Sequence, residues 1–269
     1  MPATPVYLCG TVGSVLDLAH AFAAESCLPV WGSILAGCQR SGRGQLRREW
    51  ISPPGNIYAA LRLPLVEPFA SGAASLAVGA LLVEVFEPQG IRLLLKWPND
   101  LLLELPPSTS VPQEFMFGKA GGILLEERAG VLIAGIGINV ASAPFHECIR
   151  EGGLPATFLN CLPNVSILVM EELLDLWYSL VDSFIVCYRQ WGRIGNNDWL
   201  ASVEQRLVWK GEPVLLDDGA FHRGILLGLS DLGGVRLLCD GVEKEFLSGN
   251  LSSVHHRIFF NECLRYENF

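Results

Sequence analysis

The sequence predicts an α/β domain followed by a small β-unit, and three observations lead to this prediction. Val131 to Ile138 is a near-continuous apolar run, which is typical of a central strand in a sheet. Apolar residues recur at helical spacing over residues 14–24 and 170–191, which predicts helices that pack on that sheet. From Arg206 to Val254, short strands alternate with turns rich in Gly and Asp, a pattern typical of a small barrel or sandwich.

The remaining elements follow from shorter signals along the chain. Residues 70–86 have few polar interruptions and predict a buried helix. Residues 106–114 are rich in proline, serine and threonine, so we expect a loop outside the chemistry. A change of composition near Asn196-Asn197-Asp198 predicts a loose linker, up to Val203, between the two units. Short apolar runs predict strands at residues 6–9, 29–36, 57–63, 92–95, 101–103 and 123–126.

Bulk composition excludes several classes of function. The net charge of −9 over 269 residues argues against nucleic acid, and therefore DNA, as the main partner. No apolar run reaches the roughly 18 residues that a membrane-spanning helix needs, and the N-terminus lacks a signal-peptide pattern. The eight cysteines show no C-x-x-C pair and no metal-ligand spacing. We therefore expect reduced thiols in a cytoplasmic protein without a membrane segment.

Three unusual stretches are candidates for the chemistry. The first, residues 38–50 (CQRSGRGQLRREW), places four arginines, two glycines and a tryptophan in one segment. The others are residues 96–100 (KWPND) and 118–126 (GKAGGILLE), which contain two of the four lysines in the chain. Glycine lets a backbone approach a ligand closely, and arginine and lysine bind phosphate and carboxylate. The stretches together predict an anion-binding site, whereas an isolated arginine cluster would more often be a solvated turn.

With residues 135–139 (GIGIN) as a fourth motif, these stretches resemble those of the biotin–protein ligases in content, order and spacing. The resemblance extends from about Val6 to His255. It implies a mixed β-sheet flanked by helices, similar to class II aminoacyl-tRNA synthetases, and a small C-terminal SH3-like β-barrel. The implied domains are a catalytic domain at 1–203, an SH3-like domain at 204–256 and a tail at 257–269, without the DNA-binding module of regulatory members.

The resemblance also implies an enzyme and its substrates. Such an enzyme makes biotinoyl-5′-AMP from biotin and ATP, with Mg²⁺, and transfers biotin to a lysine of a biotin carboxyl carrier protein. Lys119 and Arg43 would serve catalysis, with Arg43 near the carboxylate and the phosphate. Biotin would be bound by Ser14, Gln39, Gly42, Arg43, Lys119, Gly121 and Gly122, and ATP by Gly44, Trp50, Lys96, Asn99 and Asn139. The resemblance is compatible with a monomer and with a homodimer, and it gives no metal ligands.

Departures from the family pattern keep other hypotheses open. Val15 and Leu16 follow Ser14 where the family has Thr-Asn, Gln45 stands in place of an arginine, and Arg47 in place of a glycine. The second hypothesis is therefore a non-catalytic relative that binds biotin or a nucleotide, or that serves as an interaction module. A third, a lipoate or octanoate transferase, is weaker because its Arg-Arg-x-x-Gly-Gly motif is absent.

Several candidate residues also have a purely structural interpretation. Ser14 precedes an expected helix and could only cap it. Lys96 could form an ion pair without touching a ligand, and Asp100 could pair with a loop arginine. The glycines at 135 and 137 could be required by sheet packing alone, and Trp97 and Pro98 could be turn and packing residues. Lys119 has the weakest structural interpretation, because the start of an Ala-Gly-Gly strand needs no cation for folding.

Overall fold

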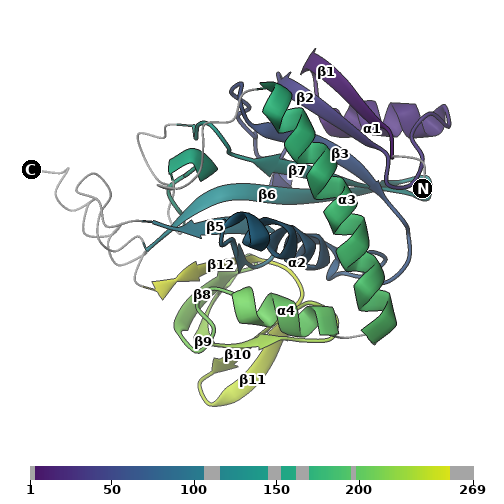
Figure 1. Cartoon of the computed structure of the whole chain (residues 1–269). Helices are drawn as coiled ribbons and strands as arrows, with labels where there is room; N and C mark the ends of the chain where they lie inside the picture. Colours follow the sequence, from purple (N-terminus) through teal and green to yellow (C-terminus); the bar gives the residue numbers. More distant parts are fainter. Residues whose placement is uncertain (1–3, 106–115, 145–152, 162–169, 195–197, 255–269) are drawn as a thin grey trace, which may run out of the picture.

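The computed structural model of the protein describes residues 4–105, 116–144, 153–161, 170–194 and 198–254 (Figure 1). The expected loop at 106–114 and the expected tail at 257–269 therefore lie outside the described residues. The α-helices are α1 (Val15–Ala24), α2 (Ala74–Phe86), α3 (Met170–Ile194) and α4 (Asp198–Arg206). The strands are β1 (Val6–Val12), β2 (Ser33–Gln39), β3 (Ile57–Leu63), β4 (Leu94–Lys96), β5 (Asp100–Glu104), β6 (Phe117–Arg128), β7 (Val131–Ile138), β8 (Pro213–Asp217), β9 (Phe221–Leu229), β10 (Val235–Cys239), β11 (Val242–Phe246) and β12 (Asn250–Ser253).

A seven-stranded sheet forms the larger part of the fold, in the order β1-β2-β3-β7-β6-β5-β4. β1 and β2 are parallel and are joined through α1, whereas the other neighbouring strands are antiparallel. β7 lies between β3 and β6, where its near-continuous apolar run predicted a central strand. The prediction of a mixed sheet flanked by helices is therefore confirmed.

The sheet has two covered faces because side chains alternate along each strand. On β3, Ile57, Ala59 and Leu61 belong to the core beneath α2 and α3, whereas Tyr58 and Ala60 pack with α1. Figure 1 shows α3 crossing in front of the sheet and α1 near its β1 edge. Among the motif residues, Trp50 packs with the cluster on the α1 face, whereas Trp97 and Ala120 belong to the core beneath α2 and α3.

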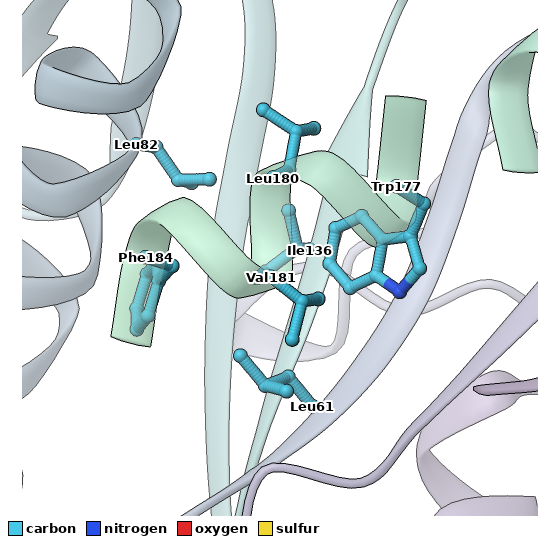
Figure 2. A pocket seen from close by; sticks show the side chains of 7 residues that line it. All are labelled: Leu61, Leu82, Ile136, Trp177, Leu180, Val181 and Phe184. Carbon is cyan, nitrogen blue, oxygen red and sulfur yellow. The ribbon is translucent and has the colours of Figure 1, made fainter. Parts of the chain in front are cut away.

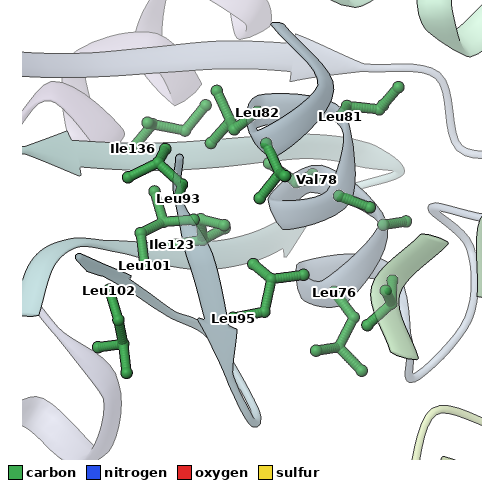
Figure 3. Packing of buried hydrophobic residues seen from close by; sticks show 14 of the residues in the cluster. Leu76, Val78, Leu81, Leu82, Leu93, Leu95, Leu101, Leu102, Ile123 and Ile136 are labelled. Atoms are coloured by element: carbon green, nitrogen blue, oxygen red, sulfur yellow. The ribbon is translucent and has the colours of Figure 1, made fainter. Parts of the chain in front are cut away.

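Helix α2 is apolar around most of its circumference because it is covered on several sides. It contacts β4 and β6 of the sheet and also α3 and α4. Figure 3 shows its leucines among buried side chains from β4, β5, β6 and β7. A buried helix was predicted over residues 70–86, and the structure begins it at Ala74.

A small apolar gap remains between α3 and the sheet. Its lining comes from α2, α3, β3 and β7 and consists of Leu61, Leu82, Ile136, Trp177, Leu180, Val181 and Phe184 (Figure 2). The one polar group in this lining is already satisfied, because the indole Nε1 of Trp177 donates to Ser33 Oγ at 2.9 Å. The gap is part of the core on the α2 and α3 face, so it is a packing feature and not the candidate site.

The C-terminal strands form a second, antiparallel sheet in the order β11-β10-β9-β8-β12. Short strands between turns were predicted here, and this prediction is confirmed. The sheet is open, with β11 at one edge and β12 at the other. A closed barrel would require the strands to pair all the way round, so only the β-unit, and not the closure of an SH3-like barrel, is established.

Residues 198–206, which fall in and just beyond the expected loose linker, form helix α4. Its Trp199 and Val203 are buried, and they belong to one continuous core together with residues of both sheets. Glu204 Oε1 accepts a hydrogen bond from Leu229 N at 2.8 Å and so ties α4 to β9. The two sheets are therefore joined by a packed helix. Among the described helices, none is long and apolar enough to cross a membrane.

Gly121→Ala is expected to lower the free energy of unfolding by about 2 kcal/mol. A β carbon at Gly121 would lie 2.7 Å from the carbonyl oxygen of Gly137 on the paired strand β7, and two central backbones cannot separate cheaply. Gly10→Ala is the matched control, because Gly10 is also a strand residue but a β carbon there meets nothing within 4 Å. Urea unfolding measures both changes, and a Gly121→Ala midpoint equal to that of the wild type would contradict the expectation.

Candidate active site

The arginine-rich segment folds into a tight loop that delivers Trp50 to the sheet. Gly44 N donates to Arg48 O at 2.7 Å, and Trp50 N donates to Gly42 O at 2.9 Å. A β carbon at Gly42 would collide with the carbonyl oxygen of Trp50, so this position accepts only glycine without a shift of the loop. The segment predicted as a candidate anion loop is therefore held closed by its own backbone.

The indole of Trp50 lies over two glycines of the sheet. A β carbon at Gly137 of β7 would lie 2.7 Å from the indole Cε2, and one at Gly122 of β6 would lie 3.2 Å from Cζ3. Gly135 instead faces α1, where a β carbon would lie 3.0 Å from the side chain of Leu16. Packing thus explains Gly135, whereas Gly122 and Gly137 form a flat floor beneath a predicted site residue.

Three charged side chains from β4, β5 and β6 meet beside this floor. Lys119 Nζ lies 2.6 Å from Asp100 Oδ1, and Lys96 Nζ lies 3.1 Å from Asp100 Oδ2. Lys119 Nζ also lies 5.3 Å from the centroid of the Trp50 ring, a cation–π distance. The exposed fraction of the side chain rises from 5% at Lys96 through 13% at Asp100 to 32% at Lys119. The cluster therefore opens to the outside at Lys119.

The charge state of Asp100 follows from this arrangement. Burial alone would raise the pKa of Asp100, but the charges of Lys119 and Lys96 and their hydrogen bonds lower it to about 2. The carboxylate is therefore ionised at neutral pH and binds both lysines at once. Asp100 was expected to pair with a loop arginine as one alternative. The structure instead pairs each of its two oxygens with a lysine.

Arg43 is held in a different cluster. Its guanidinium contacts Asp17 at 2.5 and 2.9 Å and Glu126 at 3.1 Å. Arg128 reaches the same two carboxylates, and the buried ring of His20 lies 3.9 Å from Glu126. Hydrogen bonds from Arg43, followed by those from Arg128, lower the pKa of Asp17 despite partial burial. In this structure Arg43 therefore connects the arginine-rich loop to α1 and β6 through ion pairs.

Ser14 and Gln39 meet at the beginning of α1. Gln39 Oε1 accepts from Val15 N at 3.0 Å, and its Nε2 donates to Ser52 Oγ at 3.1 Å. Ser14 occupies the N-cap position in an extended conformation, but its hydroxyl makes no capping hydrogen bond. The hydroxyl is buried and has no partner. Ser14 therefore does not cap α1 through its side chain.

Two asparagines lie at strand ends near the glycine floor. Asn99 Nδ2 donates to Ile123 O at 2.7 Å, and Asn139 Nδ2 donates to Thr157 O at 3.0 Å. The Oδ1 of Asn139 and the Nε1 of Trp50 are buried without a partner, like the hydroxyl of Ser14. Leaving such a group unsatisfied costs about 1–3 kcal/mol. These residues, taken from three different motifs or elements, thus keep polar atoms that a ligand could satisfy.

The structure brings some predicted residues together and separates others. Lys119 lies with Lys96 beside Trp50 and Gly122, whereas Arg43 lies with carboxylates that the sequence analysis did not select. Glu126, which pairs with Arg43 and Arg128, ends the third motif, so the motif itself offered a signal for this carboxylate. Asn250, which contacts Lys96 Nζ at 3.2 Å, had no comparable signal.

Comparison with known proteins agrees with this geometry. Residues 25–142 match the biotin/lipoate A/B protein ligase family. The chain is 32% identical over 220 residues to the biotin–[acetyl-CoA-carboxylase] ligase of Paracoccus denitrificans, covering 76% of this chain and 82% of that one. The chain therefore belongs to the biotin/lipoate A/B protein ligase family.

Within that family, the resemblance is to the biotin ligases. The structure of the Aquifex aeolicus biotin protein ligase in complex with biotin and ATP superposes with a TM-score of 0.69 at 27% identity, over 92% of this chain and 97% of that one. The bifunctional ligase/repressor BirA of Bacillus subtilis is 31% identical over 140 residues, or 51% of this chain and 39% of its own length.

Proposed function

We propose that the protein catalyses the ATP-dependent ligation of biotin to protein. Biotin and ATP first give biotinoyl-5′-AMP and pyrophosphate, and biotin then passes to a lysine of a biotin carboxyl carrier protein. The observation that carries the proposal is that Ser14, Trp50 and Asn139 each keep a buried, unpartnered polar atom. These are residues that the family motifs assign to biotin and ATP. Membership of the family supports the same function.

In the first step a carboxylate oxygen of biotin attacks the α-phosphorus of ATP. The bond from that phosphorus to the bridging oxygen breaks, and pyrophosphate leaves with the electron pair. We assign Lys119 to this step, because its ammonium lies at the open end of the charged cluster. There it can bind the carboxylate and the α-phosphate together. A fixed cation close to the developing charge stabilises the transition state, and Asp100 keeps the cation fixed.

In the second step the amine of the acceptor lysine attacks the acyl carbon of biotinoyl-5′-AMP. The bond between that carbon and the phosphate oxygen breaks, AMP leaves, and the nitrogen loses a proton to become an amide. The enzyme forms no covalent bond in either step. Positioning and charge are therefore what its residues must supply.

The other predicted residues take roles that fit their surroundings. Ser14 and Gln39 would bind the ureido group of biotin, and Gly42, Gly121 and Gly122 would shape the biotin site by letting the loop, β7 and the Trp50 ring approach closely. Trp50 and Asn139 would bind the adenine, and Gly44 and Asn99 the phosphates. Because Lys96 is only 5% exposed, we assign it to holding Asp100 rather than to direct contact with ATP. Arg43 would exchange its carboxylate partners for the ligand's anionic groups.

We propose that Mg²⁺ enters as part of the ATP substrate. In the described part of the chain, no group of three His, Cys, Asp or Glu side chains could hold a metal ion. Mg²⁺ usually keeps several waters and is bound by substrate phosphates with one or two protein carboxylates. The residues present fit an ion that arrives already bound to ATP, and it would neutralise phosphate charge there.

The larger organisation is proposed on the same basis. Residues 1–203 would be the catalytic domain, 204–256 an SH3-like unit whose barrel is incompletely closed, and 257–269 a tail.

The unpaired thiols of Cys9, Cys27, Cys38, Cys187 and Cys239 favour a reducing compartment such as the cytoplasm. The net charge of −9 favours a protein acceptor over DNA. Both a monomer and a homodimer are compatible with this proposal.

The proposed function is tested by pyrophosphate release. The protein with biotin, ATP and Mg²⁺ should release pyrophosphate above a control without biotin, and octanoate or lipoate in place of biotin should not support release. A carrier domain added afterwards should become biotinylated. Calorimetric binding of biotin without any pyrophosphate release would instead favour a non-catalytic relative.

A further inference from the structure

Lys119 is held in place by contacts that reach into the second sheet, and the catalytic importance of that placement rests on the proposed function. Lys96 is a buried cation whose Nζ donates to Asp100 Oδ2 at 3.1 Å and to Asn250 Oδ1 at 3.2 Å. Asn250 is the first residue of β12 in the second sheet, and it lies 154 positions after Lys96. The charged cluster of the candidate site thus continues across the junction between the two sheets.

The carboxylate of Asp100 bridges Lys96 and Lys119, so it connects the contact with Asn250 to Lys119. One oxygen of Asp100 binds Lys96 and the other binds Lys119, and only 13% of the side chain is exposed. A carboxylate held at both oxygens cannot turn toward one lysine without moving relative to the other. The direction in which Asp100 presents its oxygen to Lys119 therefore depends on where Lys96 is anchored.

The junction around Lys96 is itself fixed by neighbouring contacts. The indole Nε1 of Trp97 donates to Gly233 O at 2.9 Å, and Val208 N donates to Leu95 O at 2.9 Å. β12 is also paired with β8 along its length. The amide of Asn250 is therefore presented to Lys96 by two well-anchored backbones.

We propose that Asn250 is a positioning residue for the adenylation step. By accepting a hydrogen bond from Lys96, its side-chain oxygen sets the position of Asp100, and Asp100 in turn sets that of the Lys119 ammonium. Without this acceptor, Lys96 is left with an unsatisfied donor in a buried place and draws Asp100 toward itself. A shift of about 1 Å in a reacting group can cost up to about a hundredfold in rate.

Asn250→Ala is expected to lower kcat for biotin-dependent pyrophosphate release by about tenfold, with the KM for biotin unchanged within about twofold. Asn250→Asp keeps an oxygen acceptor for Lys96 and should restore kcat to within about threefold of the wild type. Ser252→Ala is the matched control, because Ser252 lies in the same strand as Asn250 but its Oγ donates to Leu215 O of β8 and not to a group of the lysine cluster. Equal kcat values for Asn250→Ala and wild type would overturn the proposal. An equal loss in Ser252→Ala would do the same, since it would show a general effect of β12.

A second measurement does not depend on turnover. Acetylation of Lys119 by limiting acetic anhydride, read by peptide mass spectrometry against the exposed Lys244, reports how firmly its ammonium is held. Asn250→Ala should increase the relative labelling of Lys119, and Ser252→Ala should not. If the wild type released no pyrophosphate, the proposed function would fail, whereas this labelling would still test the coupling. Unchanged labelling in Asn250→Ala would overturn the coupling itself.

Discussion

Lys119→Ala is expected to reduce kcat for biotin-dependent pyrophosphate release by about a hundredfold or more. The ammonium of Lys119 is the exposed end of the charged cluster and stands beside Trp50 at the glycine floor. Removing it takes away the fixed cation that binds the attacking carboxylate and the α-phosphate together. Steady-state pyrophosphate release under saturating biotin and ATP measures the effect.

The control for this variant is Lys210→Ala. Lys210 also forms an ion pair, with Glu204, and its side chain is 40% exposed against 32% for Lys119, but it lies in the second unit. Its loss should leave kcat unchanged within about twofold, because an exposed ion pair contributes little. A Lys119→Ala protein that keeps its thermal stability and turns over like Lys210→Ala would remove Lys119 from the mechanism.

Asp100→Asn is expected to lower the free energy of unfolding by about 3 kcal/mol at neutral pH. The substitution leaves two ammonium groups, those of Lys96 and Lys119, around a neutral amide in a largely buried place. Glu243→Gln is the matched control, because it removes a carboxylate from an exposed ion pair with Arg236 and should cost less than about 1 kcal/mol. Denaturant unfolding of both variants measures the difference. A similar small loss in the two would show that Asp100 is not the central counter-ion.

The same carboxylate predicts a pH dependence. Because the pKa of Asp100 is about 2 in the folded protein, below its ordinary 3.8, its ionisation stabilises the fold above about pH 4. That contribution, about 2 kcal/mol, is lost as the pH falls from 4 toward 2. The stability difference between wild type and Asp100→Asn should therefore shrink steadily over this range. A difference that stays constant from pH 5 to pH 3 would contradict the lowered pKa.

Much of the fold followed from periodicity in the sequence. The apolar run at Val131–Ile138 became the central strand β7, and the helical stripe at 170–191 became α3. These elements are predictable because one local pattern decides which face is buried. Residues 198–206 were harder to predict, since two asparagines suggested a turn while the spacing of Trp199 and Val203 supported a packed helix.

The candidate site was predictable only where its motifs supply both partners. Lys96 and Asp100 belong to one motif, and the motifs also named Lys119 and Trp50. Of the partners of Arg43, Glu126 belongs to the third motif, but Asp17 could not be predicted in this way, because it comes from α1 and only the folded sheet brings it near. Asn250 is more remote still, since its contact depends on the packing of one sheet against another. Contacts of this kind are set by tertiary packing, which no local pattern encodes.

The contacts around Lys96 and Trp97 also limit how freely this architecture can be recombined. Lys96 has its counter-ion Asp100 in its own unit but takes a hydrogen-bond acceptor, Asn250 Oδ1, from the other, so a foreign C-terminal unit without that acceptor leaves a buried donor unsatisfied. Gly233 adds a steric condition, because a β carbon there would collide with Ala73 at the beginning of α2. A chimera that takes its C-terminal unit from a relative must therefore inherit an acceptor for Lys96 and a glycine facing Ala73. The two units must therefore be exchanged together, although each has its own sheet.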